Sequence, residues 1–124
     1  MLIKLNKLYA LIQDMNFKVI AGKGGMDRPV RWVQMVENAE IAAFLDGDEV
    51  IITTGIAISE KGDLLELIKV AYKNNASGII INIGPFIKEI SKEVIDFCNK
   101  HNFPLLQAPW EVQMAQQLMK VTKS

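Results

Sequence analysis

Two stretches of the chain are apolar on consecutive residues, and they constrain its fold more than any other feature. They are residues 49–54, with the sequence EVIITT, and Gly78–Ile83, with the sequence GIIINI. A strand with one wet face alternates apolar and polar residues, whereas a strand covered on both faces is continuously apolar. Helical periodicity between such strands favours right-handed βαβ units. The pattern predicts an α/β fold with a largely parallel central sheet and flanking helices, built from βαβ units from residue 49 onward.

Other elements can be placed around this pair. Apolar residues at steps of three and four predict an opening helix, with Leu5, Leu8, Ile12 and Met15 on one face. Two strands should follow before residue 49, at 17–21 and 30–36, and we expect them to join the sheet. Three helices should begin at the N-caps Asn38, Asp63 (with Glu66 as a capping box) and Ser91. A strand at 105–108 and a last helix from Glu111 complete the expected order.

Charge and composition limit the class of protein. The 124 residues fit one domain, and the 14 basic and 14 acidic residues cancel. Binding to phosphate backbones needs clustered Lys and Arg, so we expect the isolated domain not to bind duplex DNA. Cys98 is the only cysteine, which excludes an internal disulfide. Without a signal-peptide pattern or an apolar run of membrane-spanning length, a cytoplasmic protein without membrane contact is expected.

The carboxyl ends of the expected strands are the best place to look for a site. In open parallel sheets, ligands bind beyond these ends. A carboxylate, hydroxyls, amides, flexible glycines and one large aromatic residue gather there. The candidate ligand-binding residues are Glu37, Thr53, Thr54, Gly55, Asn82, Gly84, Pro85, Pro109, Trp110 and Glu111.

Two interpretations of this rim stay open. In the first, Trp110 offers a flat face to a ring, Thr54 offers a hydroxyl, and Gly55 and Gly84 allow close backbone approach to a small polar ligand. Glu37 could then accept hydrogen bonds from a nitrogen-rich compound. In the second, the glycines only permit tight turns and Trp110 closes the end of the core.

Catalytic and metal chemistry find little support. The loop 22–25 (GKGG) lacks the strand-loop-helix pattern of a phosphate-binding loop, and we interpret it as a hairpin-like connection. His101 is the only histidine, which argues against a metal site, and Cys98 suits a small core residue. No nucleophile, base and orienting group stand together, so we expect no enzyme, no metal and no cofactor.

Three blocks together resemble the N-terminal domain of the PucR-type purine-catabolism regulator family. They are V-R-W-V at 30–33, L-x-G-D-E-V-I-I-T-T-G at 45–55, and N-F-P-L-L-x-x-P-W at 102–110. The likeness runs from about Leu5 into the last expected helix. It implies a regulatory domain of a bacterial transcription regulator, with purine-pathway compounds as the namesake ligands. It also implies that DNA is bound only through a C-terminal region that is not in this chain.

Two functions from different classes follow. The first is a sensory domain that binds a small metabolite and biases a downstream DNA-binding module. The second is a structural module that pairs protomers without any ligand. A homo-oligomer is expected because the first helix and the Met-rich last helix offer more apolar surface than a small domain covers. The apolar residues of the first helix are Leu2, Leu5, Leu8, Leu11, Ile12 and Met15.

Overall fold

The fold is described by a computed structural model that covers residues 2–60 and 62–110. In chain order the elements are β1 (Ile3–Lys4), α1 (Leu5–Ile12), the 3-10 turn η1 (Gln13–Met15), β2 (Lys18–Ala21), the 3-10 turn η2 (Lys23–Gly25), β3 (Pro29–Val30), β4 (Trp32–Met35), α2 (Ala39–Ala42), β5 (Glu49–Thr53), α3 (Asp63–Lys73), β6 (Gly78–Ile83), α4 (Lys92–Lys100) and β7 (Leu105–Pro109). The last expected helix, from Glu111, lies outside the described residues.

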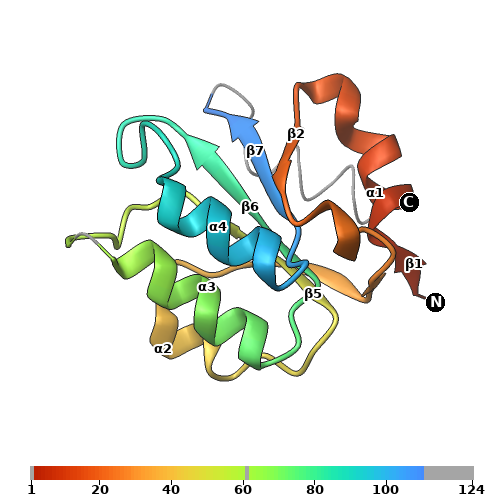
Figure 1. Ribbon diagram of the computed structural model, residues 1–124, viewed down its shortest axis with the longest axis horizontal. Helices are drawn as coiled ribbons and strands as arrows, with labels where there is room; N and C mark the ends of the chain where they lie inside the picture. The colour runs from red at the N-terminus through yellow and green to blue at the C-terminus, as the bar shows by residue number, and fades with distance from the viewer. Residues whose placement is uncertain (1, 61, 111–124) are drawn as a thin grey trace.

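The predicted parallel sheet is confirmed. Five strands run in the order β2-β7-β6-β5-β4, and β1 and β3 form a separate two-stranded ribbon. The pairs β4–β5, β5–β6 and β6–β7 are all parallel, and only β2 at one edge runs antiparallel to its neighbour β7. Figure 1 shows α3 and α4 lying in front of the sheet. The carboxyl ends of β4, β5, β6 and β7 therefore meet at one edge.

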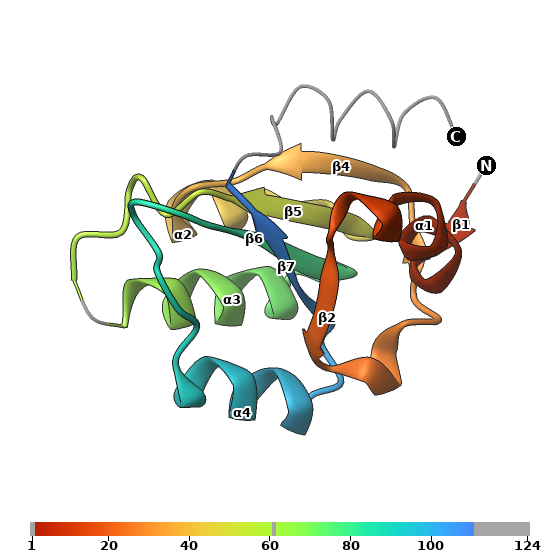
Figure 2. The same cartoon turned by 90° about the horizontal axis from the view of Figure 1, so that it is seen from above.

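Two apolar clusters explain the continuous runs of β5 and β6. Ile51, Ile79 and Ile81 point into a cluster shared with α3 and α4. Their neighbours Val50, Ile52 and Ile80 point to the other face, into a cluster shared with α1. Figure 2 shows α3 and α4 side by side on one side of the sheet, away from α1. Each strand needs apolar residues at every position because successive side chains face opposite layers.

The helix starts were predicted correctly in two of three cases. The side chain of Asn38 accepts from Ile41 N (2.9 Å) at α2, and that of Ser91 accepts from Val94 N (3.4 Å) at α4. The capping box at Asp63 is wrong. Gly62, with φ of 102°, is the N-cap of α3, and Asp63 is the first helical residue. Its carboxylate accepts instead from the backbone of Glu60 and Ser59, and these bonds hold the pKa of Asp63 below its usual value.

The second expected strand, 30–36, is not one strand. It divides at Arg31, whose N–H donates to the carbonyl of Asp48 (2.7 Å) while β3 turns aside to pair with β1. Only β4 joins the main sheet, beside β5. The bond to Asp48 and the ribbon partner both come from distant parts of the chain, so local sequence does not show the break.

The hairpin-like interpretation of the loop 22–25 is also wrong. The strands on either side, β2 and β3, pair with β7 and β1 and not with each other. The three glycines of the loop lie against the α4–β7 connection. A Cβ on Gly22 would come within 2.0 Å of the Phe103 carbonyl oxygen, and one on Gly25 within 1.9 Å of the Asn102 carbonyl oxygen. The glycines are thus explained by close packing.

Cys98 and His101, the two reactive side chains considered in the sequence, both have packing roles in the fold. Cys98 is fully buried in the α3–α4 cluster, and burial raises the pKa of its thiol to about 12. His101 is the C-cap of α4, and its ring packs 4.4 Å from Phe97 and 4.8 Å from Tyr72. No group of metal-binding side chains occurs among residues 2–60 and 62–110. Within the same residues, no helix has the length and apolar character to cross a membrane.

Candidate functional site

The strand ends bring most of the expected site residues to one edge of the sheet. Thr53 ends β5, Asn82 lies near the end of β6, and Pro109 ends β7 opposite Ile83. Glu37 follows β4 by two residues. Thr54 and Gly55, Gly84 and exposed Pro85, and Trp110 directly follow their strands. Glu111 lies outside the described residues.

Glu37 is the most heavily bonded side chain of this edge. Its carboxylate accepts from the hydroxyls of Thr53 and Thr54, each at 2.7 Å. It also accepts from the backbone N–H of Thr54 (3.0 Å) and of Gly55 (3.2 Å). Backbone N–H groups at such a turn form a natural cradle for an anion. In this chain the cradle already holds an internal carboxylate, which ties the end of β4 to the end of β5.

A polar row crosses the sheet at this edge. Met35 pairs with Ile52, Thr53 with Ile81, and Asn82 with Ala108. Continuing these registers by one or two residues aligns Glu37 with Thr54, Thr54 with Asn82, and Asn82 with Ala108. The short bond between Glu37 and Thr54 agrees with that alignment. The row therefore places a carboxylate, a hydroxyl and a carboxamide side by side at the ends of adjacent parallel strands.

Asn82 differs from the rest of the row. It is 1% exposed, and its Oδ1 is the buried side-chain atom without a hydrogen-bond partner among the described residues. Side chains alternate along β6, so Asn82 faces the same side as Ile80, and its neighbour Ala108 belongs to that cluster too. A buried polar atom without a partner is rare and calls for a specific explanation.

The turn glycines are in contact with the neighbouring loops. Gly55 has φ of 84°, and a Cβ on it would lie 2.4 Å from the Ile87 side chain and 3.3 Å from Cβ of Phe86. A Cβ on Gly84 would lie 2.4 Å from the Trp110 ring. Both glycines are therefore required for tight packing between consecutive loops, as the turn-and-plug interpretation expects.

An exposed apolar rim surrounds the same edge. Ile56 is 62% exposed, Phe86 48% and Trp110 42%, and each follows the end of β5, β6 or β7 by one to three residues. The rings of Phe86 and Trp110 meet edge to face, with centroids 6.0 Å apart. Sequence reasoning found Trp110 and missed Ile56 and Phe86. A signal existed, because each of those two follows a glycine of a strand-end turn. Contiguous exposed apolar side chains commonly mark a binding surface.

Two cavities open beside this rim, on either side of the β5–α3 loop. The first, about 350 Å³, is mainly polar, and its walls include the carboxylates of Glu37, Glu40, Asp63 and Glu66. The second, about 380 Å³, is mainly apolar and lies between the starts of α3 and α4, with Leu64, Phe86 and Val94 in its walls. Ile58 lines both. Of the residues expected from the sequence, Glu37 is the one that lines the polar cavity.

Glu49, a buried carboxylate at the start of β5, lies at the opposite edge and has a structural partner set. Its two oxygens accept from the backbone N–H of Asp46 (2.9 Å) and Gly47 (2.8 Å). These bonds close the turn between α2 and β5. Glu49 is therefore separate from the carboxyl-edge residues.

Comparison with known proteins places the chain in a family. The model of the purine catabolism regulatory protein-like family, PucR, matches residues 5–124. The chain belongs to the PucR family. The purine catabolism regulatory protein of Bacillus subtilis (strain 168) is 30% identical over 100 residues, which are 80% of this chain and 19% of that protein. Transcriptional activator PmfR of Paenarthrobacter nicotinovorans is 25% identical over 99 residues, 76% of this chain and 20% of that protein. This PucR-family chain thus spans about a fifth of these relatives.

A solved structure shares the fold. The CBS and DRTGG domains of the regulatory region of Clostridium perfringens pyrophosphatase, complexed with the activator diadenosine tetraphosphate, superpose with a TM-score of 0.62. The match covers 95% of this PucR-family chain and 49% of that chain, at 16% identity. The likeness at this identity concerns the fold alone. The family resemblance and the fold class expected from the sequence are both confirmed.

Proposed function

We propose that the chain is the signal-sensing domain of a cytoplasmic PucR-type transcription regulator. It binds a small polar metabolite, a purine-catabolism or related nitrogen compound, at the carboxyl edge of β4–β7. Binding biases a DNA-binding module located elsewhere in the longer regulator. The domain itself carries out no reaction. Family membership supports the regulatory role, since both relatives bear the names of regulators.

The observation that carries the proposal is the combination of groups at this edge. Exposed Ile56, Phe86 and Trp110 follow the ends of β5, β6 and β7, at the same edge as the Glu37 carboxylate and the unpartnered Asn82 oxygen. Small-molecule sites typically join apolar walls to a few placed polar groups. The exposed rim supplies the apolar walls and the row supplies the polar groups. Both lie at the edge where open parallel sheets bind their ligands.

A thermal-shift screen of purines, their ureide breakdown products and amino acids tests this. A ligand bound only by the native state raises the melting temperature, and at 100 times Kd it stabilises by about 2.7 kcal/mol. For a ligand found in this way, Trp110→Leu should weaken binding about tenfold or more, because the ring face is lost.

Trp32→Leu is the matched control. Trp32 is 51% exposed but begins β4, beside Glu49 at the opposite edge of the sheet. The Trp32→Leu variant should therefore bind the ligand with unchanged affinity. Equal loss in both variants, or no loss in Trp110→Leu, would place the ligand away from the carboxyl edge.

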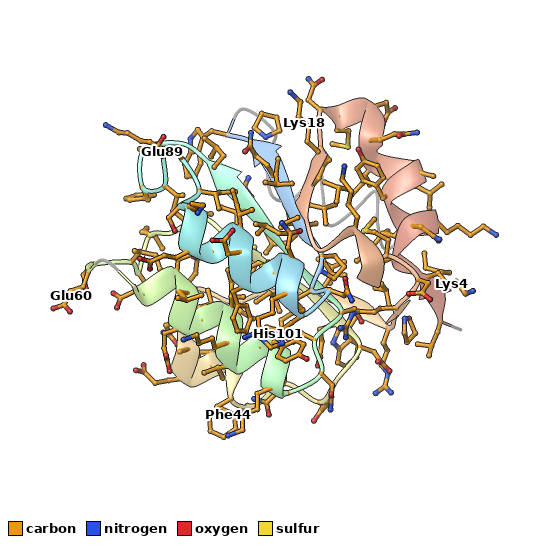
Figure 3. The ribbon with its side chains drawn as sticks, in the orientation of Figure 1. Lys4, Lys18, Phe44, Glu60, Glu89 and His101 are labelled. Carbon is orange, nitrogen blue, oxygen red and sulfur yellow. The ribbon has the colours of Figure 1, made fainter. Side chains whose placement is uncertain are left out.

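A second candidate function is self-association without a ligand. The apolar surface that the sequence predicted for self-association is partly wrong, because Leu5, Leu8 and Ile12 of α1 are buried in the core. A different surface favours the idea: Ile41 on α2 is 48% exposed, and Phe44, two residues after the end of that helix, is 82% exposed and points away from the body in Figure 3. If this surface pairs protomers, sedimentation velocity should show a dimer that Phe44→Glu dissociates. A monomer at high concentration in the unaltered chain would contradict it.

A further inference from the structure

The side chain of Asn82 has no visible structural role in the part of the chain that the structure describes. Its side chain lies on the α1 face of β6, between Thr54 and Ala108 in the row, and its Oδ1 is buried without a donor. Burying an acceptor without a partner destabilises a fold, and an apolar residue of the same shape avoids that loss. Ile80, two residues earlier on the same face, is such an apolar residue. A carboxamide at position 82 therefore suggests a partner that is absent from the free domain.

Glu37 limits the charge of that partner. Its carboxylate fills the backbone cradle of Thr54 and Gly55 and takes both threonine hydroxyls. The turn donors that could otherwise hold a ligand's phosphate or carboxylate are already used, and a second anion beside Glu37 would be repelled. The adjoining polar cavity adds the carboxylates of Glu40, Asp63 and Glu66. The carboxylates gathered here thus favour a ligand that donates hydrogen bonds over an anion.

We infer that Asn82 is the specificity-determining residue of the ligand site, and that it accepts a hydrogen bond from an N–H group of an uncharged or cationic ligand. The inference rests on the proposed function, because it names the class of compound that the same site takes. The partly exposed rings of Trp110 and Phe86 suit a planar ring that carries such an N–H group.

The first experiment needs no ligand. Asn82→Leu keeps the approximate shape and removes the unpartnered acceptor, so the melting temperature of the free domain should stay the same or rise by about 3–6 °C. Asn99→Leu is the matched control, because the Asn99 Oδ1 does have a partner, the N–H of Gly22 at 2.9 Å. That variant should melt at a lower temperature. A clear fall in the melting temperature of Asn82→Leu would show that Asn82 is structural and would overturn the inference.

The second experiment uses paired probes. Hydantoin and uracil carry ring N–H donors, and their N,N′-dimethyl derivatives have the same rings without donors. Titration of the unaltered domain should show binding of the N–H compounds and at least tenfold weaker binding of the dimethyl forms. Asn82→Leu should lose this preference. Inorganic phosphate and acetate should give no shift in melting temperature.

The outcomes separate the inference from the proposed function. Equal binding of both members of a pair, or an unchanged preference in Asn82→Leu, overturns the role of Asn82 while metabolite sensing stands. A domain that binds only anions overturns the ligand class and leaves sensing intact. A domain that binds neither these probes nor any compound of the metabolite screen contradicts both.

Discussion

Gly22→Ala should lower the free energy of unfolding by about 3–5 kcal/mol, the largest effect expected of a single methyl group in this chain. Two causes add. Gly22 has φ of 70°, a conformation that costs an alanine about 1–2 kcal/mol. The new Cβ would also lie 2.0 Å from the Phe103 carbonyl oxygen and 2.7 Å from Pro104 N. The η2 loop would have to withdraw from the α4–β7 connection, and the bond from Gly22 N to Asn99 would be strained.

Two variants separate these causes in urea unfolding. Gly62→Ala places a Cβ in open space at φ of 102°, so it reports the conformational cost alone, about 1–2 kcal/mol. Gly25→Ala has no positive φ, but its Cβ would meet the Asn102 carbonyl oxygen at 1.9 Å, so it reports the steric cost. If Gly22→Ala proved no more destabilising than Gly62→Ala, the close packing of the loop would be refuted.

Glu37→Ala should destabilise the domain by about 2–4 kcal/mol, because four donors at the end of β5 lose their acceptor together. These donors are the Thr53 and Thr54 hydroxyls and the N–H groups of Thr54 and Gly55. Thr53 is fully buried, so water replaces its lost bond poorly. Glu37→Gln keeps one oxygen acceptor, so its free energy of unfolding should lie between those of the unaltered chain and Glu37→Ala.

Glu89→Ala is the control for removing a carboxylate near the same edge. Glu89 is exposed in the β6–α4 loop and points outward in Figure 3, so its loss should change stability by no more than about 0.5 kcal/mol. Chemical unfolding compares the three variants. A Glu37→Ala protein as stable as Glu89→Ala would mean that the bonds to Glu37 contribute nothing to the fold.

The sequence was sufficient for those parts of the fold that depend on local pattern. The apolar runs of β5 and β6 and the spacing of Val94 and Cys98 on α4 report burial directly, so the sheet and its helices were predictable. The break at Arg31 was not, since it depends on the Asp48 carbonyl 17 residues later and on β1. The loop 22–25 was misinterpreted for the same reason, because its glycines are required by close contact with Asn102 and Phe103, which are distant in sequence.

For the candidate site, sequence reasoning reached the correct edge but not the relations within it. Strand ends can be located one at a time, which found Glu37, Thr54, Asn82 and Trp110. The bond between Glu37 and Thr54 and the position of Asn82 beside Thr54 depend on the register of three strands. Register is a tertiary property, so neither the internal filling of the anion cradle nor the unpartnered oxygen could be foreseen.

Tryptophan fluorescence tests most directly whether a metabolite binds at the carboxyl edge. The chain has two tryptophans, so Trp32→Phe leaves Trp110 as the only one. Trp110 is 42% exposed and packs on Gly84 and Phe86, so its emission reports on this edge. For a compound that raises the melting temperature, titration should shift or quench that emission with the same Kd as the thermal effect. A stabilising compound that leaves Trp110 emission unchanged at saturation would contradict a site at this edge.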